Sequence, residues 1–514
     1  MTDKAAAGGG WTPGEDLLAE VGRVAGAMVT EGKAPGVAWG VVTRDGLAAS
    51  GGAGVARLDG EVPGSGSVFR IASMSKSFTA AAVLLLAERG AVRLDSPVST
   101  YVPEFGKIRP YTQDSPPVTV AHLLSMSSGL ATDDPWADRQ ESLPADQFEA
   151  EVARGLRAVA APGTAFEYSN TGYALLGAIV SRATDRPFPE FIGETFLAPL
   201  GLEHTTYDFS TVPDDRLTRG YFKLKAGAPW EEQAFSGPGA YSSIGGVLSC
   251  IDDLALWVQW LADGFPARDG LDAGPLSRAS RRAMQTAHIA IPPVLRAGSS
   301  RGRLTVQEAS EIGGYGYGLF IGQDPVFGTN AEHPGGYPGY GTSMRWHLDS
   351  GLGVIVLANG RYAPSRVLSD RLLRLVLQDA GAVGYTVEPW PETRAAALAI
   401  TAALAGGGDP FEAVQFTMNV PLDLDFDRRR AALAEVLAKV GPVAPEAEPA
   451  IVEAEVTSEA HLVWTLPAER GRVRCEIKLS PQGTPVVQTL VFAPVATVPP
   501  DDLVLTSPTV RVTW

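Results

Sequence analysis

The segment Phe69–Phe78 reads FRIASMSKSF and places two serines and a lysine among apolar residues, where a helix is predicted to begin. Ser73 and Lys76 are three residues apart, so in a helix their side chains lie on one face within reach of each other. A serine hydroxyl becomes a strong nucleophile when a base removes its proton, and a lysine can act as that base if burial or a nearby cation lowers its pKa. The alternative is a helix cap followed by an exposed lysine.

The residues around this pair favour the nucleophile interpretation. The run AAAVLLLAERG follows it, so residues 75–89 read as a helix that is apolar on nearly all sides. A lysine at the head of such a helix is partly removed from water. Of the eight lysines in the chain, Lys76 is the one with a serine three residues before it. The start of the helix would also stabilise negative charge that develops beside Ser73.

Composition indicates a soluble globular protein with more than one domain. The chain has 514 residues, of which 45% are hydrophobic and 19% charged, and its formal net charge is −16. Such an acidic chain is a poor partner for nucleic acid or an anionic membrane. The N-terminal residues MTDKAAAGGGWTPGED lack the apolar core of a signal peptide, so we expect a cytoplasmic protein. Cys250 and Cys475 show no metal-ligand spacing and are expected to be buried thiols.

Hydrophobic periodicity predicts one long two-lobed α/β domain over residues 11–385. Its early and late parts read as strands that share a sheet, and its middle reads as mostly helical. The predicted helices are 17–28, 75–89, 119–126, 146–158 and 170–182, and the predicted strands are 36–43 and 47–53, followed by β-rich runs at 315–322, 342–348 and 353–360. Asp133 and Asp134 are interpreted as part of a loop, and Asp252 and Asp253 as a helix start.

Residues 386–514 are predicted to form a separate, small α+β module. Asp427–Val440 places Leu433, Val436, Leu437 and Val440 on one helix face, and Val473, Cys475, Ile477 and Leu479 alternate with charged residues as in a half-buried strand. We therefore expect helices followed by an antiparallel sheet. The module could cover a cleft, pair subunits or bind a ligand.

Two further segments join FRIASMSKSFTA to make a series of three motifs. They are PGTAFEYSNTGYALLGAIV at residues 162–180 and EHPGGYPGYGTS at residues 332–343. In order, separation and local context, the series resembles that of serine β-lactamase-like and penicillin-binding-protein-like hydrolases. These include class C β-lactamases, D-alanyl-D-alanine carboxypeptidases, D-aminopeptidases and related esterases. The resemblance covers roughly residues 15–380 and implies an antiparallel sheet flanked by helices, with an all-helical lobe.

The resemblance also implies a role for each motif residue. Ser73 would be the acylated nucleophile, Lys76 its base, and Tyr168 a second proton carrier that serves the leaving group and later the deacylating water. The backbone N–H groups of Ser73 and Gly336 would form the oxyanion hole. Asn170 would donate a hydrogen bond to the acyl side of the substrate, although it also suits a helix N-cap. The resemblance implies neither a metal ion nor an organic cofactor.

The third motif departs from the common pattern, because His333 stands where many relatives have the lysine of Lys-Thr-Gly. A histidine offers at most a charge that titrates near pH 7, so a permanent cation for a substrate carboxylate is missing there. Gly335 would let the substrate approach the strand closely. Tyr315, Tyr317, Tyr337 and Tyr340 interleave with glycines and could line a pocket or pack at the strand edge; Tyr337 is the substrate-binding candidate among them.

These features together predict a serine hydrolase that cleaves a small ester or amide, as esterases and D-aminopeptidases do, with a small molecule or short peptide as substrate and His333 in the catalytic set. Three alternatives remain: β-lactamase or carboxypeptidase activity, a peptide-cyclising thioesterase, and a catalytically idle binding protein. A homo-oligomer is possible.

Overall fold

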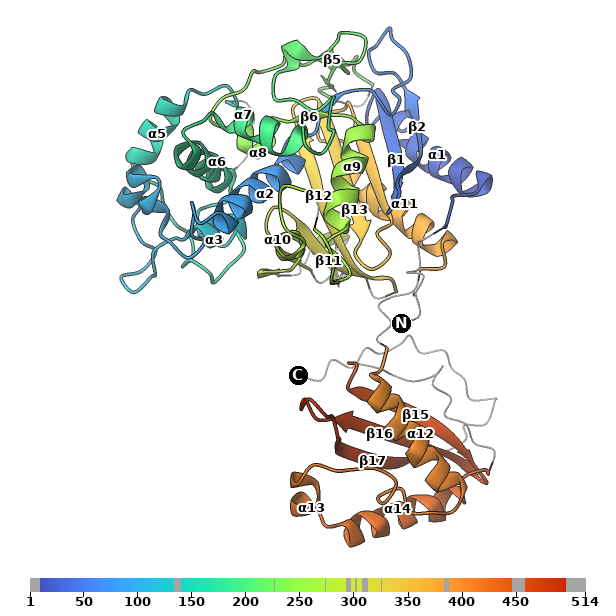
Figure 1. The fold of residues 1–514 in the computed structure, drawn as a ribbon. Helices are drawn as coiled ribbons and strands as arrows, with labels where there is room; N and C mark the ends of the chain where they lie inside the picture. Colours follow the sequence, from blue (N-terminus) through green and yellow to red (C-terminus); the bar gives the residue numbers. More distant parts are fainter. Residues whose placement is uncertain are drawn as a thin grey trace. The chain divides into compact units, whose positions relative to one another are not determined.

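The computed structural model of this chain describes residues 10–133, 140–225, 227–272, 274–292, 297–300, 303–306, 313–324, 326–382, 388–445 and 458–495. The chain divides into two compact units, Met1–Tyr385 and Thr386–Trp514 (Figure 1). Of the helices in the described ranges, none is long and apolar enough to cross a membrane.

The first unit is built on an eight-stranded antiparallel sheet. Strand β1 (Gly36–Thr43) pairs with β2 (Gly46–Gly54) on one side and with β14 (Gly353–Ala358) on the other, so the early and late parts of the unit share the sheet. The strand order is β2-β1-β14-β13-β12-β11-β10-β7. The remaining strands are β13 (Tyr340–His347), β12 (Gly328–Tyr337), β11 (Phe320–Asp324), β10 (Gly313–Tyr315) and β7 (Ile289–Ile291).

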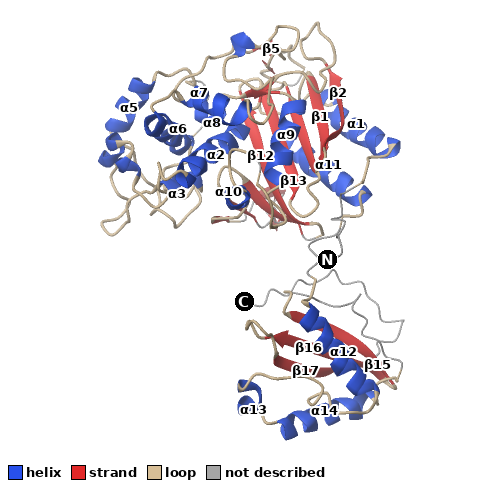
Figure 2. Cartoon of the chain, in the orientation of Figure 1, coloured by secondary structure: helices blue, strands red, loops and turns tan. Residues whose placement is uncertain are grey.

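Both faces of the central strands are buried, because helices cover each face (Figure 2). Alternate residues of β1, such as Val37 and Val41, pack with α1 (Glu15–Thr30) and α11 (Ser365–Asp379). The residues between them, such as Ala38 and Val42, belong to the larger core that includes α9 (Ile251–Ala262). This burial explains why these strands read as continuous apolar runs.

The helical lobe surrounds α2 (Ser75–Glu88), whose residues from Ser75 to Leu86 are all buried. The predicted helix at 146–158 is shorter in the structure, because Gly155 adopts a left-handed conformation at φ 102° just beyond it. The other helices are α3 (Val120–Leu124), α5 (Ala145–Ala153), α6 (Asn170–Thr184), α7 (Phe188–Ile192), α8 (Ser242–Gly245) and α10 (Arg278–Met284). Two-stranded pairs complete the unit: β3 (Phe69–Arg70) with β6 (Leu248–Ser249), β4 (Tyr221–Phe222) with β5 (Glu231–Glu232), and β8 (Ala297–Ser300) with β9 (Arg303–Val306).

The second unit is a three-stranded antiparallel sheet packed against helices. Its strands β15 (His461–Ala468), β16 (Gly471–Leu479) and β17 (Val487–Val495) follow α12 (Pro391–Ala405), α13 (Asn419–Asp423) and α14 (Phe426–Val440). Cys475 and Ile477 of β16 share a buried core with Val436 of α14 and Ile400 of α12. The two-lobed α/β fold and the small α+β module expected from the sequence are both confirmed.

Candidate active site

Ser73 lies in a strained turn between strand β3 and helix α2. The turn is a 3-10 segment, Ala72–Met74, and Ala72 has φ 53°, a left-handed conformation that costs a non-glycine residue about 1–3 kcal/mol. Strand β13 holds the turn, since Thr342 Oγ1 donates a hydrogen bond to Ile71 O at 2.8 Å. Such strain persists where the surrounding structure enforces it, and it often marks a functional residue.

Lys76 and Ser73 are in direct contact. The Lys76 side chain is fully buried, and its Nζ donates hydrogen bonds to Ser73 Oγ at 3.1 Å and to Ile244 O at 2.8 Å. The same ammonium lies 5.1 Å from the ring centre of Tyr168 and 5.8 Å from that of Tyr173. The alternative of an exposed lysine after a helix cap is therefore wrong.

Ser73 is half-buried and opens into a cavity of about 350 Å³. Of the residues singled out in the sequence, Ser73, Tyr168, Asn170, Gly335 and Gly336 line this cavity. Pro334 of the third motif also lines it, and the structure adds lining residues that sequence reasoning did not single out: Phe320, Thr342, Tyr362, Ala363, Pro364 and Arg366. Thr342 lies in the third motif, whereas no motif marks the others, which come from β11, from the loop before α11 and from α11 itself.

The end of β12 presents a free edge beside this cavity. Strand β11 pairs with β12 only as far as Glu332, opposite Phe320, whereas β13 pairs with β12 through Tyr337. From His333 onward, β13 is therefore the one partner of β12 in the described sheet. Pro334 suits such an edge because it has no N–H to donate.

His333 is fully buried and does not line the cavity. Its Nδ1 lies 2.7 Å from Pro334 O, and since a carbonyl oxygen only accepts, Nδ1 carries the proton. The Nε2 atom then accepts a hydrogen bond from the Tyr315 hydroxyl at 3.2 Å. Burial, with the Lys76 charge in support, lowers the pKa of His333 to about 3. With this pKa the imidazole carries no charge near pH 7, which agrees with the absence of a permanent cation from the third motif.

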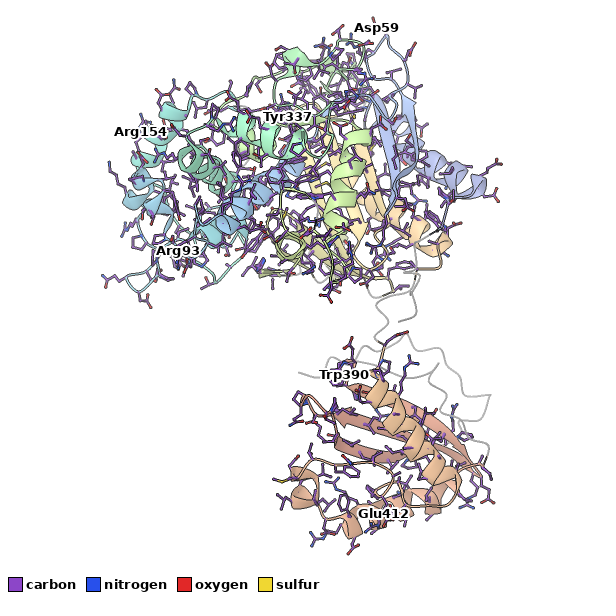
Figure 3. The ribbon with its side chains drawn as sticks, in the orientation of Figure 1. Asp59, Arg93, Arg154, Tyr337, Trp390 and Glu412 are labelled. Carbon is purple, nitrogen blue, oxygen red and sulfur yellow. The ribbon has the colours of Figure 1, made fainter. Side chains whose placement is uncertain are left out.

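Tyr337, which is labelled in Figure 3, is not among the residues that line the Ser73 cavity. Its hydroxyl donates to Glu141 Oε2 at 3.0 Å, and its ring centre is 4.8 Å from the Arg70 guanidinium. Arg70 and Glu141 form a fully buried ion pair at 2.6 Å. Tyr337 thus completes a buried charge cluster. The neighbouring tyrosines Tyr315, Tyr317 and Tyr340 are buried as well and do not line the cavity.

Asp133 is a site residue that sequence reasoning assigned to a loop. Its carboxylate accepts hydrogen bonds from the Asn170 N–H at 2.6 Å, the Thr171 N–H at 2.9 Å and the Thr171 hydroxyl at 2.7 Å. Its backbone O accepts from Asn170 Nδ2 at 2.6 Å. A carboxylate at the N-terminus of α6 is favourable. The partners are 37 positions apart in the sequence, so local spacing does not reveal this contact, and Asp134 lies outside the described residues.

Arg366 supplies a cation at the cavity, although not from the third motif. Its Nε donates to Glu332 Oε1 at 2.8 Å, and its guanidinium lies 5.1 Å from the ring centre of Phe320. The other Glu332 oxygen accepts a hydrogen bond from Arg345 at 2.6 Å. The Arg366 charge is therefore shared with a carboxylate that is itself buried.

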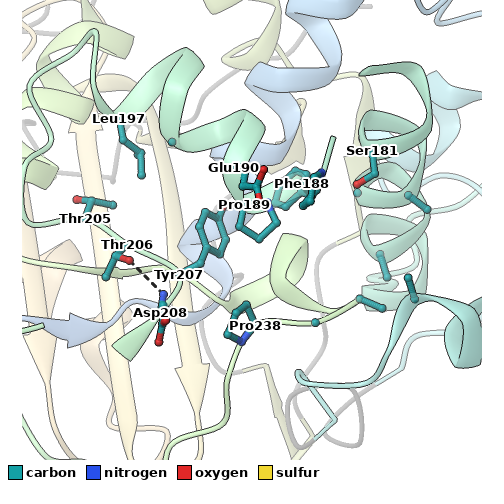
Figure 4. A pocket seen from close by; sticks show the side chains of 18 of the residues that line it. Ser181, Phe188, Pro189, Glu190, Leu197, Thr205, Thr206, Tyr207, Asp208 and Pro238 are labelled. Carbon is teal, nitrogen blue, oxygen red and sulfur yellow. Dashed lines mark hydrogen bonds between the residues drawn. The ribbon is translucent and has the colours of Figure 1, made fainter. Parts of the chain in front are cut away.

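A second, larger cavity of about 1090 Å³ lies within the helical lobe between α5, α6, α7 and residues 197–208 (Figure 4). Phe188, Leu197 and Tyr207 contribute apolar surface to it, and none of the residues singled out for catalysis lines it. Over the parts of the chain that the structure describes, no group of three or more His, Cys, Asp or Glu side chains is arranged to hold a metal ion.

A family model described as Beta-lactamase matches residues 21–378. The chain belongs to the beta-lactamase family. Penicillin-binding protein 4* of Bacillus subtilis (strain 168) is 28% identical over 309 residues, which cover 57% of this chain and 61% of that protein. Protein flp of Staphylococcus aureus (strain MW2) is 30% identical over 200 residues, 37% of this chain and 38% of that protein. The chain thus spans less than two thirds of these relatives.

Solved structures share the beta-lactamase fold at low identity. The octameric penicillin-binding protein homologue from Pyrococcus abyssi matches 92% of this chain and 99% of its own, with TM-score 0.56 and 22% identity. A D-stereospecific amidohydrolase from Streptomyces sp. matches 70% of this chain and 98% of its own, with TM-score 0.55 and 22% identity. EstCE1, a hydrolase with promiscuous acyltransferase activity, matches 71% of this chain and 98% of its own, with TM-score 0.54 and 20% identity.

Proposed function

We propose that the protein is a serine hydrolase that cleaves a small ester or amide through an acyl-enzyme at Ser73. The observation that carries the proposal is the 3.1 Å hydrogen bond from the buried Lys76 amine to Ser73 Oγ. Ser73 lines a cavity that a substrate can enter. A nucleophile and its base must be within such reach for proton transfer. Membership of the beta-lactamase family supports the same chemistry.

The proposed reaction has two halves. Ser73 Oγ attacks the substrate carbonyl carbon while its proton passes to Lys76, which acts in its neutral amine form, and the resulting oxyanion accepts hydrogen bonds from the N–H groups of Ser73 and Gly336. Each such donor contributes roughly 3 kcal/mol to transition-state stabilisation. The bond to the leaving group then breaks, and Tyr168 relays the proton held by Lys76 to that group. Water attacks the acyl-enzyme by the reverse route and regenerates Ser73.

The charges around the cavity support a neutral acyl substrate over one recognised by its carboxylate. His333 is uncharged, with its pKa lowered to about 3 by burial. The guanidinium of Arg366 is paired with Glu332. A β-lactamase or carboxypeptidase would use an unbalanced cation to hold the substrate carboxylate. The fold shared with an amidohydrolase and an esterase agrees with an ester or amide substrate.

Labelling and mutation at Ser73 test the proposal. We expect a fluorophosphonate to add to the Ser73 peptide, and Ser73→Ala to abolish turnover of p-nitrophenyl esters without a change in thermal stability. Ser50→Ala, at an exposed serine, is the control and keeps full activity. The absence of an adduct in folded protein would support an idle binding protein instead. Product analysis with an added amine separates hydrolysis from the acyl transfer of a cyclising thioesterase.

We also propose that the chain self-associates, because the structural match that extends over 92% of it is to an octameric homologue. Light scattering after size-exclusion chromatography tests this. A single species with the 54.0 kDa mass of one chain would refute it.

A further inference from the structure

The cavity in the helical lobe, between α5, α6 and α7, is separate from the cavity that contains Ser73, because the two have no lining residue in common. Its volume of about 1090 Å³ is enough for a small molecule. Phe148, Phe188, Leu197 and Leu202 line it, together with several alanines and glycines. These side chains supply apolar surface and no hydrogen-bonding group, so an occupant of this cavity needs an apolar body.

The charged side chains around this cavity are mostly acidic. Those that line it are Glu149, Glu190, Glu203, Asp208 and Arg182. The charge of Arg182 is already balanced, because its guanidinium forms ion pairs with Glu104 at 2.8 Å and with Glu149 at 2.7 Å. Within the described parts of the chain, the other three carboxylates form no ion pair. The wall therefore carries a negative charge that a cation in the cavity would complement.

Tyr207 adds a polar group that has no partner. The residue lines the cavity and is only 4% exposed, and Figure 4 shows its ring among the lining side chains. Its hydroxyl makes no hydrogen bond to any described residue, and folded proteins rarely keep a buried polar group in that state without a reason. Burial raises the pKa of this phenol, so the hydroxyl stays neutral. It can accept a hydrogen bond from an ammonium N–H, and the ring attracts a cation as well.

We propose that the cavity in the helical lobe is a second binding site, and that its ligand is a small organic cation with an ammonium group on an apolar body. The apolar body packs against side chains such as Phe148 and Phe188. The ammonium lies near Glu190 and Glu203 and donates to the Tyr207 hydroxyl. An anion of the same shape would meet the carboxylates and bind more weakly. This site goes beyond the proposed hydrolysis and does not depend on it.

Three eight-carbon probes test the site in the full-length protein by isothermal titration calorimetry. Octylammonium, 1-octanol and octanoate share an alkyl chain and differ in charge near pH 7. We expect octylammonium to bind at least about tenfold more tightly than octanoate at low ionic strength, with 1-octanol between them. High salt should reduce the difference, because it screens the carboxylates. Equal affinities, or no binding of octylammonium, would overturn the proposal.

Removal of two carboxylates should weaken this preference. Glu190 and Glu203 are exposed, so the double variant Glu190→Gln/Glu203→Gln is expected to fold normally. In this variant the ratio of octylammonium affinity to octanoate affinity should fall at least about threefold. The matched control is Glu31→Gln/Glu61→Gln, at exposed carboxylates that do not line the cavity, and it should keep the wild-type ratio. The same ratio in the two double variants would overturn the proposal.

Two further variants locate the bound ammonium. Tyr207→Phe removes only the unpartnered hydroxyl, and the affinity for octylammonium should fall at least about threefold. Ala178 of α6 lines the cavity and is half-buried, so Ala178→Phe places a ring in the space of the ligand and should weaken all three probes at least about tenfold. Ala150→Phe, at an exposed alanine of α5 outside the cavity, should bind like the wild type.

Thermal denaturation shows whether each variant is folded. If folded Ala178→Phe or Tyr207→Phe binds octylammonium as tightly as the wild type does, the ammonium lies elsewhere and the proposal is overturned. Labelling of Ser73 is a separate measurement, so its failure would count against the proposed hydrolysis and not against this site.

Discussion

Gly335→Ala should damage the site through a backbone contact. An ideal Cβ at this position falls 2.3 Å from Ile71 O and 2.1 Å from Thr342 Oγ1. Thr342 can rotate, but Ile71 O belongs to the backbone of the Ser73 turn. Carbon and carbonyl oxygen meet at about 3.3 Å, so β12 and the turn must separate by roughly 1 Å.

The turn has little freedom to yield, because Ala72 already has φ 53° and Ile71 O is held by Thr342. Overpacking of this kind costs about 1–3 kcal/mol of stability. On the proposed mechanism it also moves the Gly336 N–H relative to Ser73, and a displacement near 1 Å can cost about 100-fold in rate. We therefore expect a moderate loss of stability and a much larger loss of kcat/KM.

Urea denaturation and ester hydrolysis measure the two effects separately. The matched control is Gly193→Ala, where an ideal Cβ meets no heavy atom within 4 Å and the backbone is helical at φ −53°. This control should keep full activity and gain up to about 1 kcal/mol of stability. If the Gly335→Ala enzyme keeps kcat/KM within about threefold of wild type, the argument is refuted. Catalysis would then not depend on the close packing of the Ser73 turn against β12.

Two further predictions concern buried charge. The pKa of His333 is lowered to about 3, below its ordinary 6.5. Between these two pH values the unfolded chain binds a proton at this residue and the folded chain does not. The free energy of unfolding therefore falls as the pH drops from 6.5 toward 3. Urea titrations at pH 6.5 and 5 measure this fall in the free energy of unfolding, and it should be about 2 kcal/mol smaller in His333→Gln than in the wild type. The same pH dependence in both proteins would contradict the prediction. Glu141→Ala leaves Arg70 buried without its 2.6 Å partner and should cost about 3–5 kcal/mol by thermal denaturation, whereas Glu151→Ala, at an exposed ion pair, should cost under about 1 kcal/mol. Equal costs would contradict this.

The sequence predicted the elements of the site better than its contacts. Strand β1 begins and ends where apolar periodicity placed it, at Gly36 and Thr43, and α2 begins at Ser75 as expected, because both elements are buried and their patterns are strong. The neutral state of His333 depends on Tyr315 and on burial in the finished fold. The role of Asp133 depends on a contact across 37 residues, so neither could be read from local spacing.

The burial of His333 bears on the role of the third motif in this protein. The Lys76 charge already lowers the pKa of His333, so a lysine at position 333 would bring a second ammonium beside the first in a site closed to water. The neutral imidazole avoids that repulsion and joins the Tyr315 hydroxyl to Pro334 O, at the free edge of β12. On the proposed mechanism, His333 is therefore a positioning residue that holds this edge, and the motif supplies geometry where a lysine would supply charge.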